Sequence, residues 1–385
     1  MSTPHPFWLV GFRPFFTLAC LSGLSLPLLW VLIFLGVLPA PQASFAAVQW
    51  HAHEMFFGFG WAVLGGFLLT STKNWVQIRG YHGRALMFLV AAWLFERIGM
   101  WFGGGWPSVL FQVSNTLFLA SIVAMLVWTL VRYRKQDNYR DNSFFLLILP
   151  VFLIAKHLVL STEHFQIGIS MATGLFRMVF LIMLERTLTQ FMKGLFQTDI
   201  LRNAVLDGTI KLLGLLLVGA GLMPPPLAGW ISLLLALLLT GRFFFWKPQL
   251  AMRRLDLGIM HLGYIAIVLQ LLVEFLGQTA APVWAGSFSV HIFTLGVMGL
   301  IIPAMLIRIS KGHTGRKVIF EKTDKLVLWA MIAAFVLRVI APQVYSSAYP
   351  FWILLAATGW FAGFAILAWR LIPFLAQARV DGKEH

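Results

Sequence analysis

Long apolar runs dominate this chain. A helix needs roughly 20 apolar residues to cross a bilayer, and twelve runs have about that length. They are Phe15–Leu38, His51–Thr72, Arg84–Phe102, Pro107–Val131, Phe144–Leu160, Phe165–Gln190, Gly208–Met223, Leu227–Phe245, Leu257–Leu276, Gly286–Ile307, Leu326–Ala341 and Pro350–Phe374. The seventh is the weakest, because it is short and ends at three prolines. The pattern predicts an all-α, polytopic membrane helical bundle of about twelve transmembrane helices, forming a single integral membrane domain over residues 1–385.

The basic residues between these runs alternate from gap to gap. One set of gaps contains no Lys or Arg: Pro39–Trp50, Gly103–Trp106, Ser161–His164, Pro224–Pro226, Gly277–Ala285 and Pro342–Tyr349. The other set, together with both chain ends, contains nearly all of them. Basic loops stay in the cytoplasm. We therefore expect both termini in the cytoplasm and a multi-pass protein of the bacterial inner membrane.

Composition supports this class and excludes others. Hydrophobic residues make up 59% of the chain and charged residues only 11%, and the mean hydropathy is +0.84. A soluble domain has about a quarter charged residues, so the lipid bilayer must be the partner of this surface. The net charge is +15, but the basic residues lie in the short gaps between apolar runs, where they indicate topology. We therefore expect no nucleic acid as a partner. Cys20 is the only cysteine, which excludes an intramolecular disulfide and a cysteine-based metal cluster.

Several ionisable residues lie within the apolar runs. Such groups are expensive at membrane depth and face the bundle interior, pair with one another or mark a functional path. Structural ion pairs are an equally good interpretation of any single pair, such as Glu96 with Arg97. The residues are Arg97, Lys156, Arg177, Arg186, Arg338, Glu54, Glu96, Glu185 and Glu274.

Histidines gather at one predicted depth. His51, His53, His157 and His291 lie near the outer ends of three separate runs, and His261 lies about one turn inside the cytoplasmic end of the ninth. A single buried histidine is more often a hydrogen-bonded core residue. Several at one depth favour a metal centre, because imidazole ligates copper, iron and zinc and serves haem as an axial ligand. We predict the first four as metal ligands and His261 as a weaker candidate for a second metal.

The stretch Trp50-His51-Ala52-His53-Glu54-Met55 has its own geometry. On a helix His51 and His53 point about 200° apart. Either the pair chelates one metal from an irregular turn, or each imidazole serves a different centre. Glu54 shares a face with His51 at a spacing of three, so it is a candidate for orienting that ring or relaying protons.

The chain resembles the NnrS family of haem- and copper-containing bacterial membrane proteins of nitric oxide metabolism. The resemblance rests on Gly11-Phe12-Arg13-Pro14-Phe15-Phe16, on Trp50 to Met55 with Gly66-Phe67-Leu68-Leu69-Thr70, on Asn74-Trp75 and Gly83-Arg84, and on His157, His261-Leu262-Gly263-Tyr264, His291 and Gly312-His313-Thr314-Gly315-Arg316. The chain departs from the family pattern at Leu184-Glu185-Arg186-Thr187-Leu188-Thr189, where glycines and a proline are usual.

The resemblance implies haem b, copper and a role in handling nitric oxide. Our first hypothesis is therefore an oxidoreductase that reduces nitric oxide at a histidine-ligated haem–copper centre in the outer half of the membrane. Glu54 or Glu96 would relay protons, and Arg97 or Arg338 would neutralise haem propionates. The electron donor would be a quinol or a periplasmic carrier.

Two other classes stay open at this stage. One is a protein that binds nitric oxide, or assembles haem and copper, without turnover. The other is a secondary transporter, for which twelve helices with both ends inside is a common architecture. Proton-coupled transport should persist after treatment with chelators and after haem depletion, whereas oxidoreductase activity should be lost.

Overall fold

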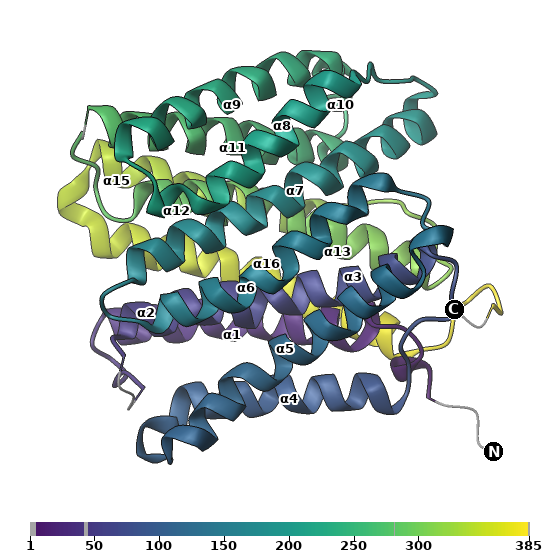
Figure 1. Ribbon diagram of the computed structural model, residues 1–385, viewed down its shortest axis with the longest axis horizontal. Coiled ribbons are helices and arrows are strands. Elements are labelled where there is room, and N and C mark those ends of the chain that lie inside the picture. Colours follow the sequence, from purple (N-terminus) through teal and green to yellow (C-terminus); the bar gives the residue numbers. More distant parts are fainter. Residues whose placement is uncertain (1–4, 42–44, 281, 384–385) are drawn as a thin grey trace. The chain divides into compact units, whose positions relative to one another are not determined.

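The computed structural model describes residues 5–41, 45–280 and 282–383, and these residues form helices and loops with no strand. Twelve stretches within them are long and apolar enough to cross a membrane, which confirms the predicted number of spans. The α-helices are α1 (Phe12–Phe34), α2 (Ala47–His53), α3 (Trp61–Trp75), α4 (Arg84–Phe102), α5 (Ser108–Arg132), α6 (Ser143–Leu160), α7 (Phe165–Phe196), α8 (Ala204–Leu216), α9 (Pro225–Phe245), α10 (Pro248–Ala251), α11 (Leu255–Thr279), α12 (Phe288–His291), α13 (Gly299–His313), α14 (Lys322–Phe335), α15 (Ala341–Val344) and α16 (Tyr349–Ala376) (Figure 1).

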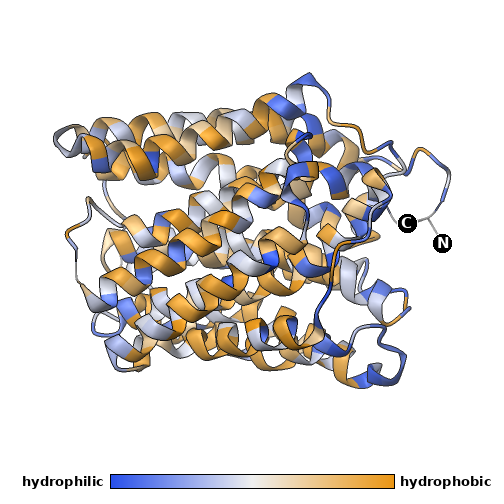
Figure 2. Cartoon of the chain, turned by 90° about the horizontal axis from the view of Figure 1, so that it is seen from above, coloured by the Kyte–Doolittle hydropathy of each residue, from blue (hydrophilic) through white to orange (hydrophobic). Residues whose placement is uncertain are grey.

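Hydrophobic residues make up most of each helix, and hydrophilic residues gather mainly at helix ends and in loops (Figure 2). Large apolar residues such as Trp128, Trp230 and Trp369 are exposed on spans α5, α9 and α16. A water-soluble monomer rarely exposes contiguous apolar surface of this kind. The surface therefore fits lipid as the solvent.

Three spans change to π-helical geometry along their length. These segments are η2 (Glu54–Gly60) between α2 and α3, η7 (Ile292–Met298) between α12 and α13, and η8 (Val336–Ile340) between α14 and α15. π-Helical turns are rare and frequently occur at functional sites. Each of these segments contains or directly follows a residue singled out from the sequence, namely His53, His291 or Arg338.

The residues group into two compact units. Unit 1 comprises Met1–Phe165, Leu306–Ile319 and Phe364–His385, and unit 2 comprises Gln166–Met305 and Phe320–Gly363. In unit 1, α1 packs against α3 and η2, and α5 packs against α4 and α6. Gly66 permits the first contact, since a Cβ there would lie 2.7 Å from the Cβ of Phe15. In unit 2, the most extensive contact joins α9 and α11.

The weak seventh span owes its reach to a change of helix type. It consists of 13 α-helical residues in α8 followed by the 6 residues of the 3₁₀-helix η6 (Leu217–Leu222). A 3₁₀-helix rises about 2.0 Å per residue, against 1.5 Å in an α-helix. Together they extend over about 30 Å, the thickness of a typical hydrocarbon core.

In unit 1, the start of α1 lies against the end of α16. The Arg13 side chain, in the first turn of α1, donates from Nη1 to the carbonyl oxygens of Leu375 and Gln377 at the end of α16. The backbone of Gly83 bonds to that of Trp8, and Val380 to Thr314. The beginning of the first span and the end of the last therefore lie at the same end of this unit, as an even number of spans requires.

Candidate functional site

The second span changes its hydrogen-bonding pattern directly after His53. His53 is the last residue of α2, and Glu54 is the first residue of the π-helical η2. Both side chains are buried, with 0% and 2% of their surface exposed. The π-helical segment therefore begins at Glu54, directly after His53, and the sequence alone had singled out both residues.

His53 lies between two carboxylates. Its Nδ1 is 3.2 Å from Glu54 Oε1, and its Nε2 is 3.3 Å from Glu96 Oε1 on α4. Asn115 of α5 places its amide nitrogen 3.1 Å from the same Nε2. A neutral ring can donate to Glu54 and accept from Asn115, whereas a doubly protonated ring can donate to both carboxylates. The surroundings thus accommodate both protonation states, as a proton carrier requires.

Two cations offset the two carboxylates. Arg97 places Nη1 3.0 Å from Glu54 and Nη2 2.8 Å from Glu96, which confirms the local pairing expected for Glu96 and Arg97. Lys156 of α6 forms an ion pair with Glu96 and donates to the backbone oxygen of Asn115. We call His53, Glu54, Glu96, Arg97, Asn115 and Lys156 the His53 cluster.

One oxygen of the cluster lacks a partner. Glu96 is fully buried, and its Oε2 accepts no hydrogen bond from the residues that the structure describes. A buried acceptor without a donor is costly. Protonation or a bound water would satisfy it.

The π-helical segment allows Arg97 to approach closely. A Cβ on Gly58 would lie 2.0 Å from Arg97 Nη1, so only glycine fits without displacing the guanidinium. Trp93, one turn before Arg97, donates from its indole to the Gly58 carbonyl at 3.1 Å. Arg97 also stacks over the Trp93 ring at 5.2 Å. The position of Arg97 is therefore set by η2 and by Trp93 together.

The two histidines of the second span diverge. α2 is regular through both of them, and while His53 enters the cluster, His51 stacks on Trp30 of α1 at 4.4 Å and 12°. The two rings therefore lie in different environments and do not form the irregular chelating turn considered for the pair. His157, next to Lys156 on α6, is exposed.

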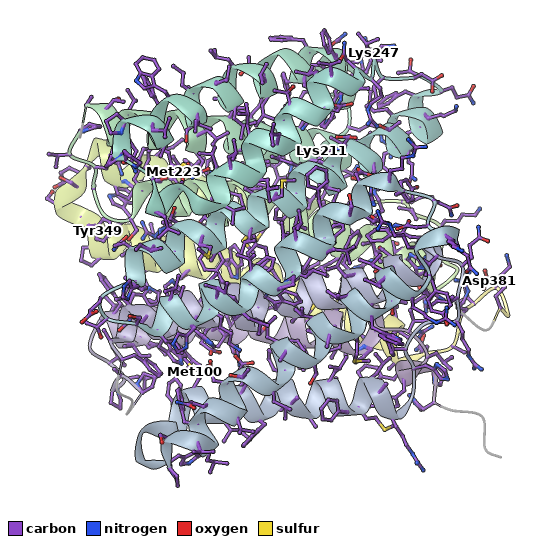
Figure 3. The ribbon with its side chains drawn as sticks, in the orientation of Figure 1. Met100, Lys211, Met223, Lys247, Tyr349 and Asp381 are labelled. Carbon is purple, nitrogen blue, oxygen red and sulfur yellow. The ribbon has the colours of Figure 1, made fainter. Side chains whose placement is uncertain are left out.

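In unit 2, His291 directly precedes a π-helical segment, as His53 does in unit 1. Its Nδ1 donates to the Ser287 carbonyl at 2.8 Å, the kind of bond that orients metal-ligating histidines. Arg338 lies within η8, where it donates to the hydroxyl of Tyr349 at 3.2 Å and lies over that ring. Figure 3 labels Tyr349. His261 is buried, with Nδ1 3.2 Å from the Leu257 oxygen and Nε2 3.4 Å from the Trp246 oxygen.

Unit 2 also contains a buried arginine with carboxylate and amide partners. Arg177 of α7 is 1% exposed and donates from Nη1 to Gln270 Oε1 at 2.7 Å and to Glu274 Oε2 at 3.0 Å, both on α11. Gln270 in turn donates to Glu274. The sequence marked Arg177 and Glu274 as ionisable residues at membrane depth, and the pairing of α7 with α11 explains why both are tolerated.

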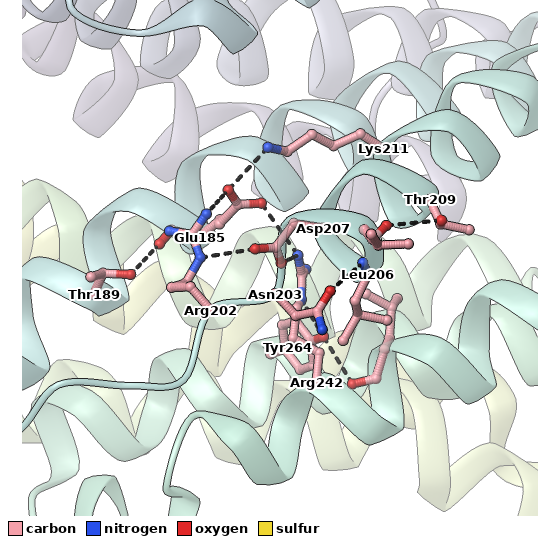
Figure 4. A network of polar contacts seen from close by, with 12 residues as sticks. Glu185, Thr189, Arg202, Asn203, Leu206, Asp207, Thr209, Lys211, Arg242 and Tyr264 are labelled. Atoms are coloured by element: carbon pink, nitrogen blue, oxygen red, sulfur yellow. Dashed lines mark hydrogen bonds and ion pairs between the residues drawn. The ribbon is translucent and has the colours of Figure 1, made fainter.

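A second charged group in unit 2, the Glu185 cluster, joins α7, α8 and α9 (Figure 4). Glu185 contacts Arg202, Lys211 and Arg242, and Asp207 contacts Arg202 and Arg242. Lys211 belongs to α8, Arg242 belongs to α9, and Arg202 lies in the loop before α8. The packing of these segments against α7 brings their charges to Glu185, at the stretch where the chain departs from the family pattern.

The predicted metal ligands are distributed over both units. His51, His53 and His157 belong to unit 1, and His261 and His291 to unit 2. Among the described residues, no group of three or more His, Cys, Asp or Glu side chains is placed to hold a metal ion. Both ring nitrogens of His53 and of His261 face other polar atoms, so these side chains as they stand do not form a copper site with several imidazoles. A haem needs a single axial imidazole, for which the orientation of His291 is suitable.

Sequence reasoning found the acids of the His53 cluster but missed Asn115. Nothing in its surroundings along the chain marks it, because its role depends on α5 lying beside α2 and α4. The sequence places Lys156 in an apolar run but does not show its partner. Its side chain reaches Glu96 from α6, a contact between residues 60 positions apart.

Comparison with known proteins gives a family. A search of curated proteins finds no match. The family profile described as NnrS protein matches residues 6–379, nearly the whole chain. This membership points to a membrane protein related to nitric oxide, and the twelve spans agree with a multi-pass protein. The chain belongs to the NnrS family.

Proposed function

We propose that this protein reduces nitric oxide to nitrous oxide in the bacterial inner membrane. The reaction consumes two NO molecules, two electrons and two protons and yields N₂O and water. A quinol or a periplasmic carrier would supply the electrons. When bound, haem b and copper would supply the binding of NO and the transfer of electrons.

The observation that carries the proposal is the placement of His53 between Glu54 and Glu96. A proton taken up on Glu96 Oε2 can transfer to His53 Nε2 once the carboxyl group rotates to present that oxygen to the ring, and the proton on Nδ1 can then leave to Glu54. Each transfer spans one hydrogen bond, and the ring has a partner in both protonation states. Nitric oxide itself is small, neutral and soluble in lipid, so a buried site needs no polar entrance.

Arg97 and Lys156 balance the charge while the proton moves. Both contact Glu96, and Arg97 also contacts Glu54. Charges at membrane depth persist when they pair internally. The cluster can therefore keep ionised carboxylates in an apolar bundle without a solvent channel. Arg97 is also the candidate in unit 1 for binding haem propionates, as Arg338 is in unit 2.

His291 is the residue we assign to the haem, on the basis of its Nδ1 bond to Ser287 and its position before η7. The fit of the copper is weaker, because His53 already has polar partners at both nitrogens. Copper content is therefore measured separately from haem content.

The first experiment is to purify the protein in detergent, quantify iron and copper per chain, and record reduced-minus-oxidised spectra before and after adding NO. Haem near one per chain, with NO consumed and N₂O formed in the presence of a chemical reductant, supports the proposal. Bound NO without N₂O supports a binding or assembly protein. Absence of both metals, from cells supplied with both, supports transport instead.

The second experiment tests the proton path. Glu96→Gln keeps the shape of the side chain but removes its ability to carry a proton, so N₂O formation should fall by about 100-fold or more while NO still binds and changes the spectrum. Glu163→Gln, an exposed acid in the loop before α7, is the matched control and should behave as wild type. Full turnover in Glu96→Gln would exclude this carboxylate from the path.

A further inference from the structure

Two family motifs that have no part in the His53 cluster meet at one end of unit 1. The run from Gly11 to Phe16 opens α1, and the run from Gly312 to Arg316 closes α13. The Phe12 and His313 rings lie 5.4 Å apart. The backbone N–H of Phe12 donates to Thr70 Oγ1 at 2.9 Å, which adds the end of α3 to the same place. These segments, far apart in the chain, build one common surface.

Arg13 is buried there without a counterion among the residues that the structure describes. It is 1% exposed, and its Nη1 donates only to backbone oxygens, those of Leu375 at 2.8 Å and Gln377 at 2.5 Å. Its Nε and Nη2 have no acceptor among the described residues. Arg242 is equally buried, yet it contacts the carboxylates of Glu185 and Asp207. An uncompensated buried cation is destabilising. Within the described ranges, the Arg13 environment has no anion like the two carboxylates beside Arg242.

The surroundings of Arg13 add further positive charge. Arg316 and Arg379 are close enough to act on Arg13 electrostatically, and Lys73 and Arg379 act likewise on His313. Arg379 Nη1 donates to the His313 oxygen at 2.9 Å. Arg316 stacks on Phe374 at 4.1 Å and donates from Nη2 to Gln377, while its Nη1 is buried without an acceptor among the described residues.

In the described part of the chain, Asp381 supplies a carboxylate at the edge of this group. Asp381 accepts from Arg379 through both oxygens, at 2.9 and 2.6 Å. It lies against Gly315, where a Cβ would come within 2.8 Å of the Asp381 carboxyl carbon. Figure 3 labels Asp381 on the C-terminal segment. Its charge offsets Arg379 and leaves the inward-facing donors of Arg13 and Arg316 unsatisfied.

We propose that Arg13, Arg316 and Arg379 bind a phosphate group. A tetrahedral oxyanion accepts several charge-assisted hydrogen bonds from guanidinium donors, which is how arginine recognises phosphate. Basic pockets at the cytoplasmic ends of transmembrane helices bind lipid head groups. The phosphate belongs either to an anionic phospholipid or to free inorganic phosphate. Its binding would tie the start of α1 to the ends of α13 and α16.

The test uses the purified, delipidated full chain. Thermal unfolding and native mass spectrometry are recorded with inorganic phosphate, with phosphatidylglycerol or cardiolipin, and with phosphatidylcholine. We expect an anionic lipid or phosphate, but not phosphatidylcholine, to bind and raise the melting temperature. Stabilisation by phosphate alone at millimolar concentration identifies the free ion, and retention of anionic lipid with no response to phosphate identifies the head group. No binding by any of these probes overturns the proposal.

The variants separate a built site from general attraction. Arg316→Gln should weaken binding at least about tenfold, the loss of one charge-assisted hydrogen bond. Lys317→Gln removes the same charge from an exposed neighbour and should have little effect. Asp381→Asn removes the competing carboxylate and should strengthen binding. Equal losses in Arg316→Gln and Lys317→Gln contradict a specific site. Should Arg316→Gln fail to fold, Asp381→Asn and Arg379→Gln still provide opposite expected shifts.

Discussion

At the residue scale, the His53 cluster depends on positions where even a slightly larger residue does not fit. Gly58 is the clearest case, because its missing Cβ is the space that Arg97 Nη1 occupies. The contacts of Arg97 with Glu54 and Glu96 therefore rest on a residue that carries no functional group. Chemistry at this site is set by backbone geometry as much as by titratable groups.

Gly58→Ala is predicted to lower N₂O formation without preventing folding. The new methyl group displaces the flexible end of Arg97 from Glu54, so the charge balance of the cluster changes while the backbone stays intact. Gly208→Ala is the control, since a Cβ at Gly208 meets nothing within 4 Å. It should stabilise α8 by about 0.5–1 kcal/mol and leave turnover unchanged. The readouts are N₂O formation and thermal unfolding. Full N₂O formation by the Gly58→Ala protein would show that the position of Arg97 does not matter for the reaction.

At the element scale, the sequence was sufficient for the spans but not for their irregularities. Hydropathy located all twelve, because bilayer thickness demands long apolar runs. It could not show η2, η7 or η8, because a π-helical turn changes which backbone groups pair and leaves composition untouched. The alternation of charge could not show that Arg13 and Arg242 are buried. Arg13 donates to a backbone oxygen of α16, and Arg242 forms an ion pair with Glu185 of α7.

The Glu185 cluster is the clearest example of elements joined by charge. Glu185→Gln leaves Lys211 and Arg242 buried with less compensation and should destabilise the protein by about 3–5 kcal/mol. The double variant Glu185→Gln with Arg242→Gln should lose less than the sum of the single losses, because the two residues are in contact. Thermal unfolding of the four proteins gives this coupling. Strict additivity would show that the contact contributes nothing to holding α7 against α9.

The C-terminal segment is predicted to loosen in acid. Hydrogen bonds from Arg379 lower the pKa of Asp381 from 3.8 to about 2. A carboxyl group whose pKa is lowered by folding stabilises the folded state at any pH above its ordinary pKa. That contribution is lost as the pH falls from about 4 to about 2. Hydrogen exchange of the peptide around residues 375–382, corrected for the intrinsic rate, should rise over this range. Asp381→Asn should remove the pH dependence, and an unchanged profile would exclude Asp381 as its source.

At the scale of the whole molecule, topology is the property that most constrains function. The predicted ligands near the outer ends of the spans and the basic residues near the inner ends are meaningful only if the chain is oriented as the charge alternation predicts. The contacts of Arg13 with Leu375 and Gln377 place the start of α1 and the end of α16 on one side of unit 1. The orientation of that side toward the cytoplasm is our proposal.

Cysteine labelling in intact cells tests this orientation directly. Cys20 is the only cysteine and is fully buried in α1, so a background of native thiols is absent without any prior substitution. We expect Glu163→Cys, in a loop without basic residues, to react with a membrane-impermeant maleimide from outside the cell. Lys383→Cys, near the C-terminus, should react only after the membrane is permeabilised. The reverse pattern would put His51, His53 and His291 in the cytoplasmic half. It would exclude electron delivery from a periplasmic carrier and leave a quinol as the proposed donor, while the proton path through Glu96 and His53 would keep its internal geometry.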